Sequence, residues 1–179
     1  MQLDLKNAYG QMRRSRTLRA VIRRCPALAP QLAQQWVQGV TWAWTRTDGQ
    51  WETFLSERGG WQGSPDSNPT FCFGLEDALD DGLQGADGLL RLGYADDTFL
   101  DGHPAAMETQ WPSLLAALAD AGHEVNPTKC NLWVGPPAHR APADDAAVQR
   151  LCMLCPPVTG AITVMGDGGR RQLFHSHWW

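Results

Sequence analysis

The sequence predicts an α+β fold with one substantial hydrophobic core in a chain of 179 residues. Two stretches alternate between apolar and polar residues on both sides of a short turn, which is typical of β-hairpins. Other stretches carry apolar residues at helical spacing, between capping residues, Pro and Gly. The chain is long enough to bury a core, and its 43% share of apolar residues is ordinary for a globular protein.

Composition narrows the cellular setting. Five cysteines, an odd number without a regular framework, argue against a disulfide scaffold and favour a reducing, intracellular compartment, either nuclear or cytoplasmic. No apolar run approaches the roughly 18 residues of a membrane span, and the N-terminal residues are unlike a signal peptide. We therefore expect no membrane partner. Most of the nine tryptophans, several of them at strand or helix spacing, are expected in the core.

Charge is distributed unevenly along the chain. Residues 1–58 hold nine Lys and Arg against four Asp and Glu, whereas residues 59–179 hold six against fifteen. The basic residues of the first segment crowd into one stretch: Lys6, Arg13, Arg14, Arg16, Arg19, Arg23 and Arg24. This stretch, Arg13, Arg14 and Arg16 above all, is a candidate for binding nucleic-acid phosphates, and a solvated helix face is the alternative.

The first third of the chain reads as a strand, two helices and a hairpin. A short strand is expected at residues 2–5, with Asp4 between two leucines. Ser15 is the expected cap of a helix that Pro26 ends, and a second helix begins near Pro30. Alternating residues on both sides of Thr47-Asp48-Gly49 then predict a hairpin.

A glycine-rich loop at residues 58–65 leads into the next predicted helix. Asn68 is the expected N-cap, with Pro69 at the first helical position, and the helix frays near Gly82. Free backbone N–H groups in a loop that opens a helix suit a phosphate or a base-paired template.

The stretch Leu92–Leu100 predicts a tight hairpin that holds Asp96 and Asp97 at its tip. Two adjacent carboxylates repel each other, and a divalent cation with hard oxygen ligands, Mg²⁺ or Mn²⁺, relieves that repulsion. A solvated acidic turn is the alternative reading.

The remaining third is predicted as helix, strand, linker and tail. A helix is expected at roughly 104–121, kinked or split by Pro112, followed by a turn and strand at 124–134. Residues 135–143 read as a linker, Asp144 as the cap of a short helix reaching about Cys155, and residues 162–166 as a last strand.

The C-terminal end offers a second candidate metal site. Cys152 and Cys155 have zinc-ligand spacing, and His175 and His177 would complete the set. Buried helix cysteines are the alternative, and the i, i+2 spacing of the histidines is shorter than usual.

Several stretches, taken in order, resemble the motifs of reverse transcriptases. Leu3-Asp4-Leu5-Lys6-Asn7-Ala8-Tyr9 resembles the first palm motif, Gln62-Gly63-Ser64-Pro65 the second, and Tyr94-Ala95-Asp96-Asp97 the third. Residues 122–130, with Asn126-Pro127-Thr128-Lys129-Cys130, resemble the fourth in the form found in non-LTR retrotransposons. Val164-Met165-Gly166 is a short match to the fifth.

The resemblance implies a reverse-transcriptase-type palm, an antiparallel sheet with helices packed on one face. It also implies RNA-directed DNA polymerase activity by two-metal nucleotidyl transfer, with two Mg²⁺ or Mn²⁺ ions, an RNA or DNA template with primer, and deoxynucleoside triphosphates. Residues 1–134 would be a palm fragment carrying the first four motifs. Residues 135–179 would be a linker, a short helix, the fifth-motif strand and an irregular tail.

The matching positions assign roles by resemblance. Asp4 and Asp96 would bridge the metal ions, Asp97 would be a third ligand, and the backbone carbonyl of Leu5 a fourth. Tyr9 would be the aromatic gate against a ribose 2′-hydroxyl, with a core tyrosine as the alternative. Gln62 and Gly63 would contact the incoming nucleotide and template. Lys129 would protonate the leaving pyrophosphate, with a plain surface lysine as the alternative.

The chain also departs from the family pattern. Pro65-Asp66-Ser67-Asn68-Pro69 replaces the usual Pro-Leu-Ser-Pro, which adds a negative charge near the template path and leaves the start of the following helix open. We expect the fingers and thumb segments to be missing. The alternative function is therefore a catalytically inactive palm-like remnant that binds nucleic acid weakly or not at all.

Overall fold

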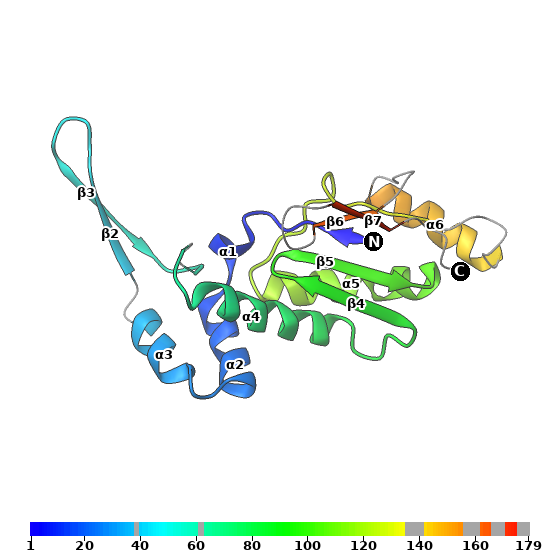
Figure 1. Cartoon of the computed structure of the whole chain (residues 1–179), viewed down its shortest axis with the longest axis horizontal. Coiled ribbons are helices and arrows are strands. Elements are labelled where there is room, and N and C mark those ends of the chain that lie inside the picture. Colours follow the sequence, from blue (N-terminus) through cyan, green and yellow to red (C-terminus); the bar gives the residue numbers. More distant parts are fainter. Residues whose placement is uncertain (38–39, 61–62, 135–141, 156–161, 166–170, 175–179) are drawn as a thin grey trace. The chain divides into compact units, whose positions relative to one another are not determined.

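The computed structural model describes residues 1–37, 40–60, 63–134, 142–155, 162–165 and 171–174. The fold is α+β, with small antiparallel sheets and helices (Figure 1), as the sequence predicts. The elements, in chain order, are β1 (Gln2–Leu3), α1 (Ala8–Gln11), α2 (Arg14–Arg24), α3 (Ala29–Val37), β2 (Val40–Thr45), β3 (Trp51–Ser56), α4 (Ser67–Gly82), β4 (Leu89–Tyr94), β5 (Asp97–Gly102), α5 (Pro104–Asp120), α6 (Pro142–Leu154), β6 (Ile162–Met165) and β7 (Arg171–Phe174).

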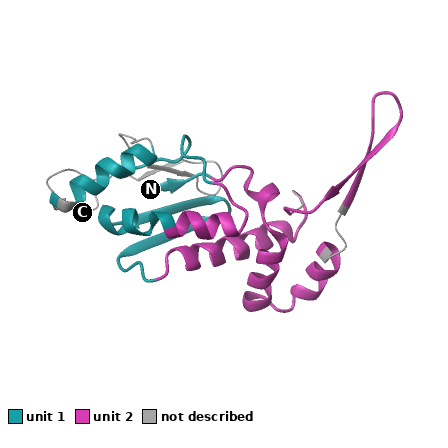
Figure 2. Ribbon diagram, turned by 180° about the vertical axis from the view of Figure 1, so that it is seen from behind, with its two compact units in different colours: residues 1–4, 85–112, 125–179 teal, residues 5–84, 113–124 magenta. Residues whose placement is uncertain are grey.

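The chain divides into two compact units (Figure 2). Unit 1 comprises Met1–Asp4, Gly85–Pro112 and Val125–Trp179, and unit 2 comprises Leu5–Gln84 and Ser113–Glu124. Both units are assembled from segments far apart in sequence. The predicted division at residue 134 stays a prediction, because residues 135–141 lie outside the described ranges.

Unit 1 contains a three-stranded antiparallel sheet in the order β1-β5-β4. Gln2 pairs with Phe99 and Leu3 with Thr98, while β4 and β5 form a hairpin that closes at the pair Tyr94–Asp97. Side chains on one face are buried, notably Leu3, Thr98 and Leu100. The opposite face is open to solvent, and it presents the stripe Leu90, Leu92 and Tyr94. The two faces follow from the alternation of side chains along each strand.

Unit 2 is built on the packing of α2 against α4, with α3 also against α2. The two longer helices approach closely where Gly74 faces Thr17, because a Cβ at Gly74 would lie 2.7 Å from Thr17 Oγ1. Phe71, Leu75 and Val21 are buried in the interior. The ribbon of β2 and β3 also belongs to this unit, paired from Val40–Ser56 to Thr45–Trp51.

Three predicted helix starts need correction. The helix expected to end at Pro26 begins at Arg14, with Arg13 rather than Ser15 at its N-cap position. Helix α6 begins at Pro142, so Asp144 lies in its first turn and is not its cap. Helix α4 begins at Ser67 after Asp66, so Asn68 and Pro69 fall in its first turn, where the backbone N–H that proline lacks is not needed. Helix α5 continues through Pro112, so it is not split there, and Trp111 and Leu114 on either side of the proline are buried.

Two strand predictions also change. Residues 131–134 form no strand, and the pairing there is an isolated bridge between Gln2 and Asn131. The expected last strand is present as β6, and it pairs with β7, which has no clear sequence signal. Helix α1, a single turn, was likewise not expected.

The expectation that most tryptophans are core residues is wrong for the ribbon. Trp42, Trp44 and Trp51 are all exposed, Trp51 to 73%, whereas Trp111 is buried. The ribbon has only two strands and packs on no third layer among the described residues, so alternation alone could not bury either face. None of the described helices combines the length and apolarity needed to cross a membrane.

His123 is an unusual core residue in unit 2. It is 3% exposed, its ring contacts the edge of Phe71, and neither ring nitrogen has a hydrogen-bond partner within the described part of the chain. Burial of the imidazole lowers the pKa of His123 from 6.5 to about 4.

We predict that this histidine destabilises the fold in mild acid. The unfolded chain takes up a proton at His123 near pH 6.5 and the folded chain only near pH 4, so stability present above pH 6.5 is lost as the pH falls through this window. The full loss is about 3 kcal/mol. Denaturant unfolding at several pH values checks it, with His123→Leu as the control that should flatten the curve between pH 7 and 5. Parallel curves for both proteins would contradict the assignment.

Candidate functional site

The β1–β5 pairing brings the first predicted carboxylate to the predicted acidic hairpin. Continuing the antiparallel register one step beyond the pair Leu3–Thr98 sets Asp4 opposite Asp97. Asp4 is half-buried and Asp97 is exposed. By strand alternation, both lie on the face opposite to the buried Leu3 and Thr98. The register thus predicts that Asp4, directly after β1, and Asp97, the first residue of β5, share the open face of the unit 1 sheet.

The turn that carries Lys129 is fixed to the backbone of Asp4. The Asn126 N–H donates to the Asp4 carbonyl at 2.8 Å, and the Asp4 N–H donates to the Cys130 sulfur at 3.3 Å. Lys129 itself is exposed in this turn, and its N–H donates to the Asn126 carbonyl at 3.0 Å. The predicted lysine thus belongs to a segment that borders Asp4 directly.

A small amide network, missed by sequence reasoning, borders the same face. Gln2 Nε2 donates to Asp97 Oδ1 at 3.4 Å, and Asn131 Nδ2 donates to Gln2 Oε1 at 3.1 Å and to the Lys129 carbonyl at 3.3 Å. Gln2 lies two residues before Asp4, so the two-residue period of a strand could have placed it on the same face. Nothing in the sequence pairs Asn131 with it.

The hairpin turn consists of Ala95 and Asp96, between the paired residues Tyr94 and Asp97. Ala95 has a φ of 54°, in the left-handed region that non-glycine residues rarely adopt. Such a conformation costs on the order of 1–3 kcal/mol and is concentrated at functional sites. Asp96, which follows it, is exposed. The turn therefore holds one carboxylate in the loop and the next at the start of β5.

The donor chemistry of Asp4, Asp96 and Asp97 fits a hard divalent cation, because all three offer carboxylate oxygens. Across the described ranges, however, no three His, Cys, Asp or Glu side chains lie close enough together to hold an ion. Leu5, whose carbonyl was predicted as a ligand, belongs to unit 2. The structure provides Asp4 directly after β1, Asp97 at the start of β5 and the exposed Asp96 in the turn before it.

Two buried thiols lie behind this site. Cys130 and Cys155 are both buried, and a hydrogen bond with the Cys155 thiol lowers the pKa of Cys130 to about 7, against the effect of burial. The same bond, together with burial, raises the pKa of Cys155. The proposed zinc set of Cys152 and Cys155 stays untested, because its histidine partners lie outside the described residues.

The nucleotide-contacting residues expected from the resemblance belong to unit 2. The Tyr9 ring stacks on Phe71 with centroids 4.2 Å apart, and its hydroxyl donates to Asn68 Oδ1 at 2.6 Å. Tyr9 is half-buried, so it combines features of a core residue with partial access to solvent. Gly63 is exposed with a φ of 93°, and Gln62 lies outside the described residues.

The glycine-rich loop is fastened to the turn of α1. The Gly59 N–H donates to the Met12 carbonyl at 2.8 Å, and the Gly60 N–H donates to the Tyr9 carbonyl at 3.0 Å. Gly59 has a φ of 75°, and a Cβ there would lie 2.7 Å from the Gly10 carbonyl oxygen. Only glycine fits this close approach.

Arg14, predicted to bind nucleic acid, is buried and serves the same loop. Its guanidinium donates to the carbonyls of Ser56, Arg58 and Gly59 at 2.6, 3.1 and 2.9 Å, and to Ser56 Oγ at 3.1 Å. Burial lowers the pKa of Arg14. Its hydrogen-bonding capacity is used inside unit 2, which speaks against direct contact with a phosphate.

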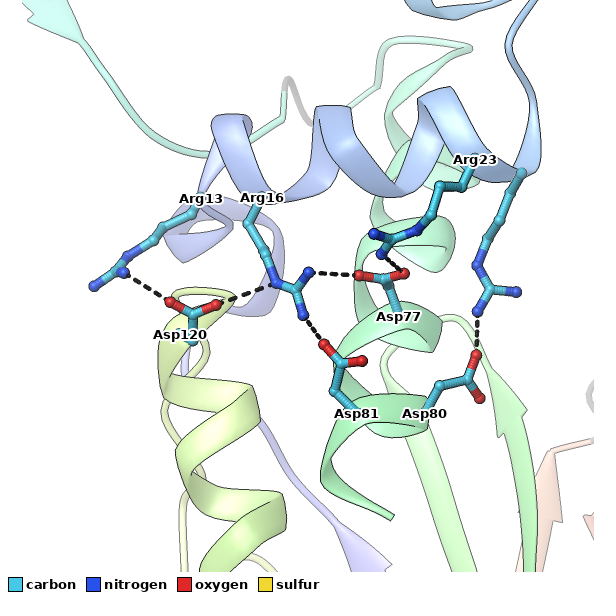
Figure 3. Close-up of polar contacts among 8 residues, drawn as sticks. Arg13, Arg16, Arg23, Asp77, Asp80, Asp81 and Asp120 are labelled. Atoms are coloured by element: carbon cyan, nitrogen blue, oxygen red, sulfur yellow. Dashed lines mark hydrogen bonds and ion pairs between the residues drawn. The ribbon is translucent and has the colours of Figure 1, made fainter. Parts of the chain in front are cut away.

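Arg16 is likewise engaged inside unit 2 (Figure 3). It pairs with Asp77 at 2.8 Å, with Asp81, and with Asp120 at 3.2 Å. The network extends on both sides through three further pairs: Arg13 with Asp120 at 3.5 Å, Arg23 with Asp77, and Arg24 with Asp80. Of the three arginines predicted to bind nucleic acid, Arg13 is the exposed one, and its role stays a prediction. The basic stretch mainly ties α2 to α4 and to the end of α5.

No protein-family model matches the chain, and no curated protein gives a significant match.

We predict that Asp77 carries more stability than its exposed neighbour Asp80. Asp77→Asn removes the buried carboxylate that Arg16 and Arg23 share, while Arg16 keeps Asp81 and Asp120. It should lower the free energy of unfolding by about 2 kcal/mol. Asp80→Asn breaks a surface pair with Arg24 and should cost at most about 1 kcal/mol. Urea unfolding followed by circular dichroism measures both, and equal losses would contradict the role given to Asp77.

Proposed function

We propose that this chain catalyses RNA-directed DNA synthesis by nucleotidyl transfer, with Asp4, Asp96 and Asp97 as the metal-binding carboxylates. The observation that carries the proposal is the register of β1 against β5, which continues to Asp4 opposite Asp97 beside the turn that holds Asp96. The left-handed Ala95 in that turn adds support, since strained residues gather at functional sites.

Each residue then has a definite task. Two divalent cations, when bound, would stabilise the attacking and leaving oxygens of an in-line phosphoryl transfer. The resemblance makes Asp4 and Asp96 the bridging pair. Because the β1–β5 register continues to Asp4 opposite Asp97, we instead assign the ions to Asp4 and Asp97, and Asp96 would add a ligand from the turn. Gln2 orients the Asp97 carboxylate by its hydrogen bond. Lys129, exposed in the turn that borders Asp4, would donate a proton to the departing pyrophosphate.

A second candidate is a catalytically inactive palm-like module. The observation that favours it is that no group of three potential ligand side chains is assembled within the described ranges. The two candidates differ in whether the carboxylates bind a cation and in whether that cation supports synthesis.

Primer extension on an RNA template with Mg²⁺ tests the proposal. Asp4→Asn, Asp96→Asn and Asp97→Asn should each lower the rate at least about 100-fold, since even the neighbours of metal ligands contribute about 10- to 100-fold. Asp101→Asn is the matched control, because Asp101 is an exposed carboxylate on the same face of β5. It should leave the rate unchanged.

Calorimetry with Mn²⁺ separates the two candidates without activity. The polymerase proposal requires binding that Asp4→Asn and Asp97→Asn each weaken and Asp101→Asn preserves. Extension rates equal to wild type in the Asp4→Asn and Asp97→Asn variants would overturn the proposal. Absence of both extension and Mn²⁺ binding in the unsubstituted chain would establish the inactive module.

A further inference from the structure

A cavity of about 580 Å³ lies in unit 2 where the β2–β3 ribbon meets the glycine-rich loop. Its described lining is formed by Gly10, Trp42, Ser56, Arg58, Gly60, Gly63 and Ser64. The volume falls within the range of about 300–1,000 Å³ that is typical of ligand sites. No acidic side chain is among these lining residues. All of these residues belong to unit 2.

The lining combines three kinds of surface. Gly10, Gly60 and Gly63 leave backbone accessible, because they carry no side chain. Trp42 supplies an aromatic surface, 40% exposed, and Arg58 supplies an exposed cation. Ser56 and Ser64 add hydroxyl groups. Bare backbone, one indole and one guanidinium are the elements that bind single-stranded nucleic acid without sequence preference, by stacking bases and attracting phosphates.

A second positive charge lies directly behind the cavity wall. The buried guanidinium of Arg14 contacts both the carbonyl and the hydroxyl of the lining residue Ser56. The oxygens that accept hydrogen bonds from Arg14 belong to carbonyl and hydroxyl groups, and none of them within the described ranges is a carboxylate. This cation is therefore not neutralised locally, and in a desolvated setting its field acts over the cavity. A carboxylate also lies behind the lining, because the Ser64 hydroxyl donates to Asp66 Oδ1. The cation that an anionic occupant would meet directly is therefore Arg58, which is exposed and lines the cavity itself.

The aromatic surface continues outward along one face of the ribbon. Trp42, Trp44 and Phe54 share this face, with the Phe54 ring 6.4 Å from that of Trp42 and 5.2 Å from that of Trp44. A row of rings leading away from a cavity suits successive bases of a strand rather than one small molecule. Glu52, opposite Trp44 in the register, ends the row with a negative charge.

We propose that this cavity binds a nucleotide unit of a single-stranded nucleic acid, with a base on Trp42 and its phosphate on Arg58. The inference deepens the proposed function and rests on it for one point, the identity of the bound strand as the template. The binding itself requires neither the carboxylates nor a metal ion.

Fluorescence anisotropy with a labelled single-stranded oligonucleotide of about 12 residues, in the presence of EDTA, tests the site. Trp42→Ala and Arg58→Ala should each weaken binding by roughly 5- to 100-fold. Trp42→Phe should restore most of the affinity, because it keeps an aromatic face. Arg58→Ala should also reduce the slope of log affinity against log salt by about one.

Two matched controls lie on the same ribbon. Trp51 is exposed on the opposite face, and Arg46 pairs with Asp48 at the far turn. Trp51→Ala and Arg46→Ala should bind as the wild type does. Circular dichroism of all variants shows whether the ribbon is intact.

The source of the nucleotide is distinguished by competition. A free deoxynucleoside triphosphate should fail to displace the oligonucleotide. Two results would overturn the inference. One is that the free triphosphate displaces the oligonucleotide from the wild type but not from Trp42→Ala. The other is that Trp42→Ala and Arg58→Ala both bind the oligonucleotide as tightly as the wild type does. Asp4→Asn should bind normally, so loss of primer extension with intact binding counts against the proposed function alone. If primer extension is intact and neither Trp42→Ala nor Arg58→Ala weakens oligonucleotide binding, the result counts against this inference alone.

Discussion

The pairing of β1 with β5 is the constraint on which the candidate site depends. It joins residues at the start of the chain to a hairpin almost a hundred positions later, and it is closed on both sides of β1. The Leu100 N–H donates to the Met1 carbonyl at 2.8 Å, and on the other side the Gln2 N–H donates to the Asn131 carbonyl at 2.8 Å. A slip of one residue in this register would turn the side chain of Asp4 to the buried face. Leu3 is buried on that face, and a slip would replace its side chain there with the carboxylate of Asp4. Burying an unpaired carboxylate is unfavourable, so the slip is opposed.

Local features of the fold were predictable from the sequence, and long-range ones were not. Both hairpins follow from alternation around short turns, and the helices follow from apolar spacing with errors of a residue or two at their ends. Helix α4 starts at Ser67, one residue before the predicted cap Asn68, and Asp66 at its N-cap position makes no side-chain capping hydrogen bond. The burial of Arg14 and Arg16 had no local signal, since their partners lie on distant segments. Exposed tryptophans in the ribbon show the converse error, because alternation indicates a strand but cannot supply the layer that covers it.

The basic stretch stabilises the packing of helices rather than offering free charge to a ligand. Its arginines face a row of aspartates on α4, so the two halves of the charge imbalance meet inside one unit. Arg14 alone bonds to carbonyl and hydroxyl oxygens, and it fixes the base of the ribbon beside the cavity. Arg14 and Arg16 are used inside unit 2, so the contacts that we propose for a nucleic acid lie at Arg58 and on the ribbon, which sequence reasoning did not single out.

The central claim is that Asp4 and Asp97 bind the same ion, and the most direct test is whether one bound ion lies close to both segments. Mn²⁺ added in small amounts to isotope-labelled protein broadens the NMR signals of amides close to it. The account predicts that amides near Asp4 and amides from Tyr94 to Thr98 broaden together, and that Asp4→Asn or Asp97→Asn abolishes both effects. Broadening confined to the hairpin, or unchanged by Asp4→Asn, would contradict the claim that the two strands form a single site.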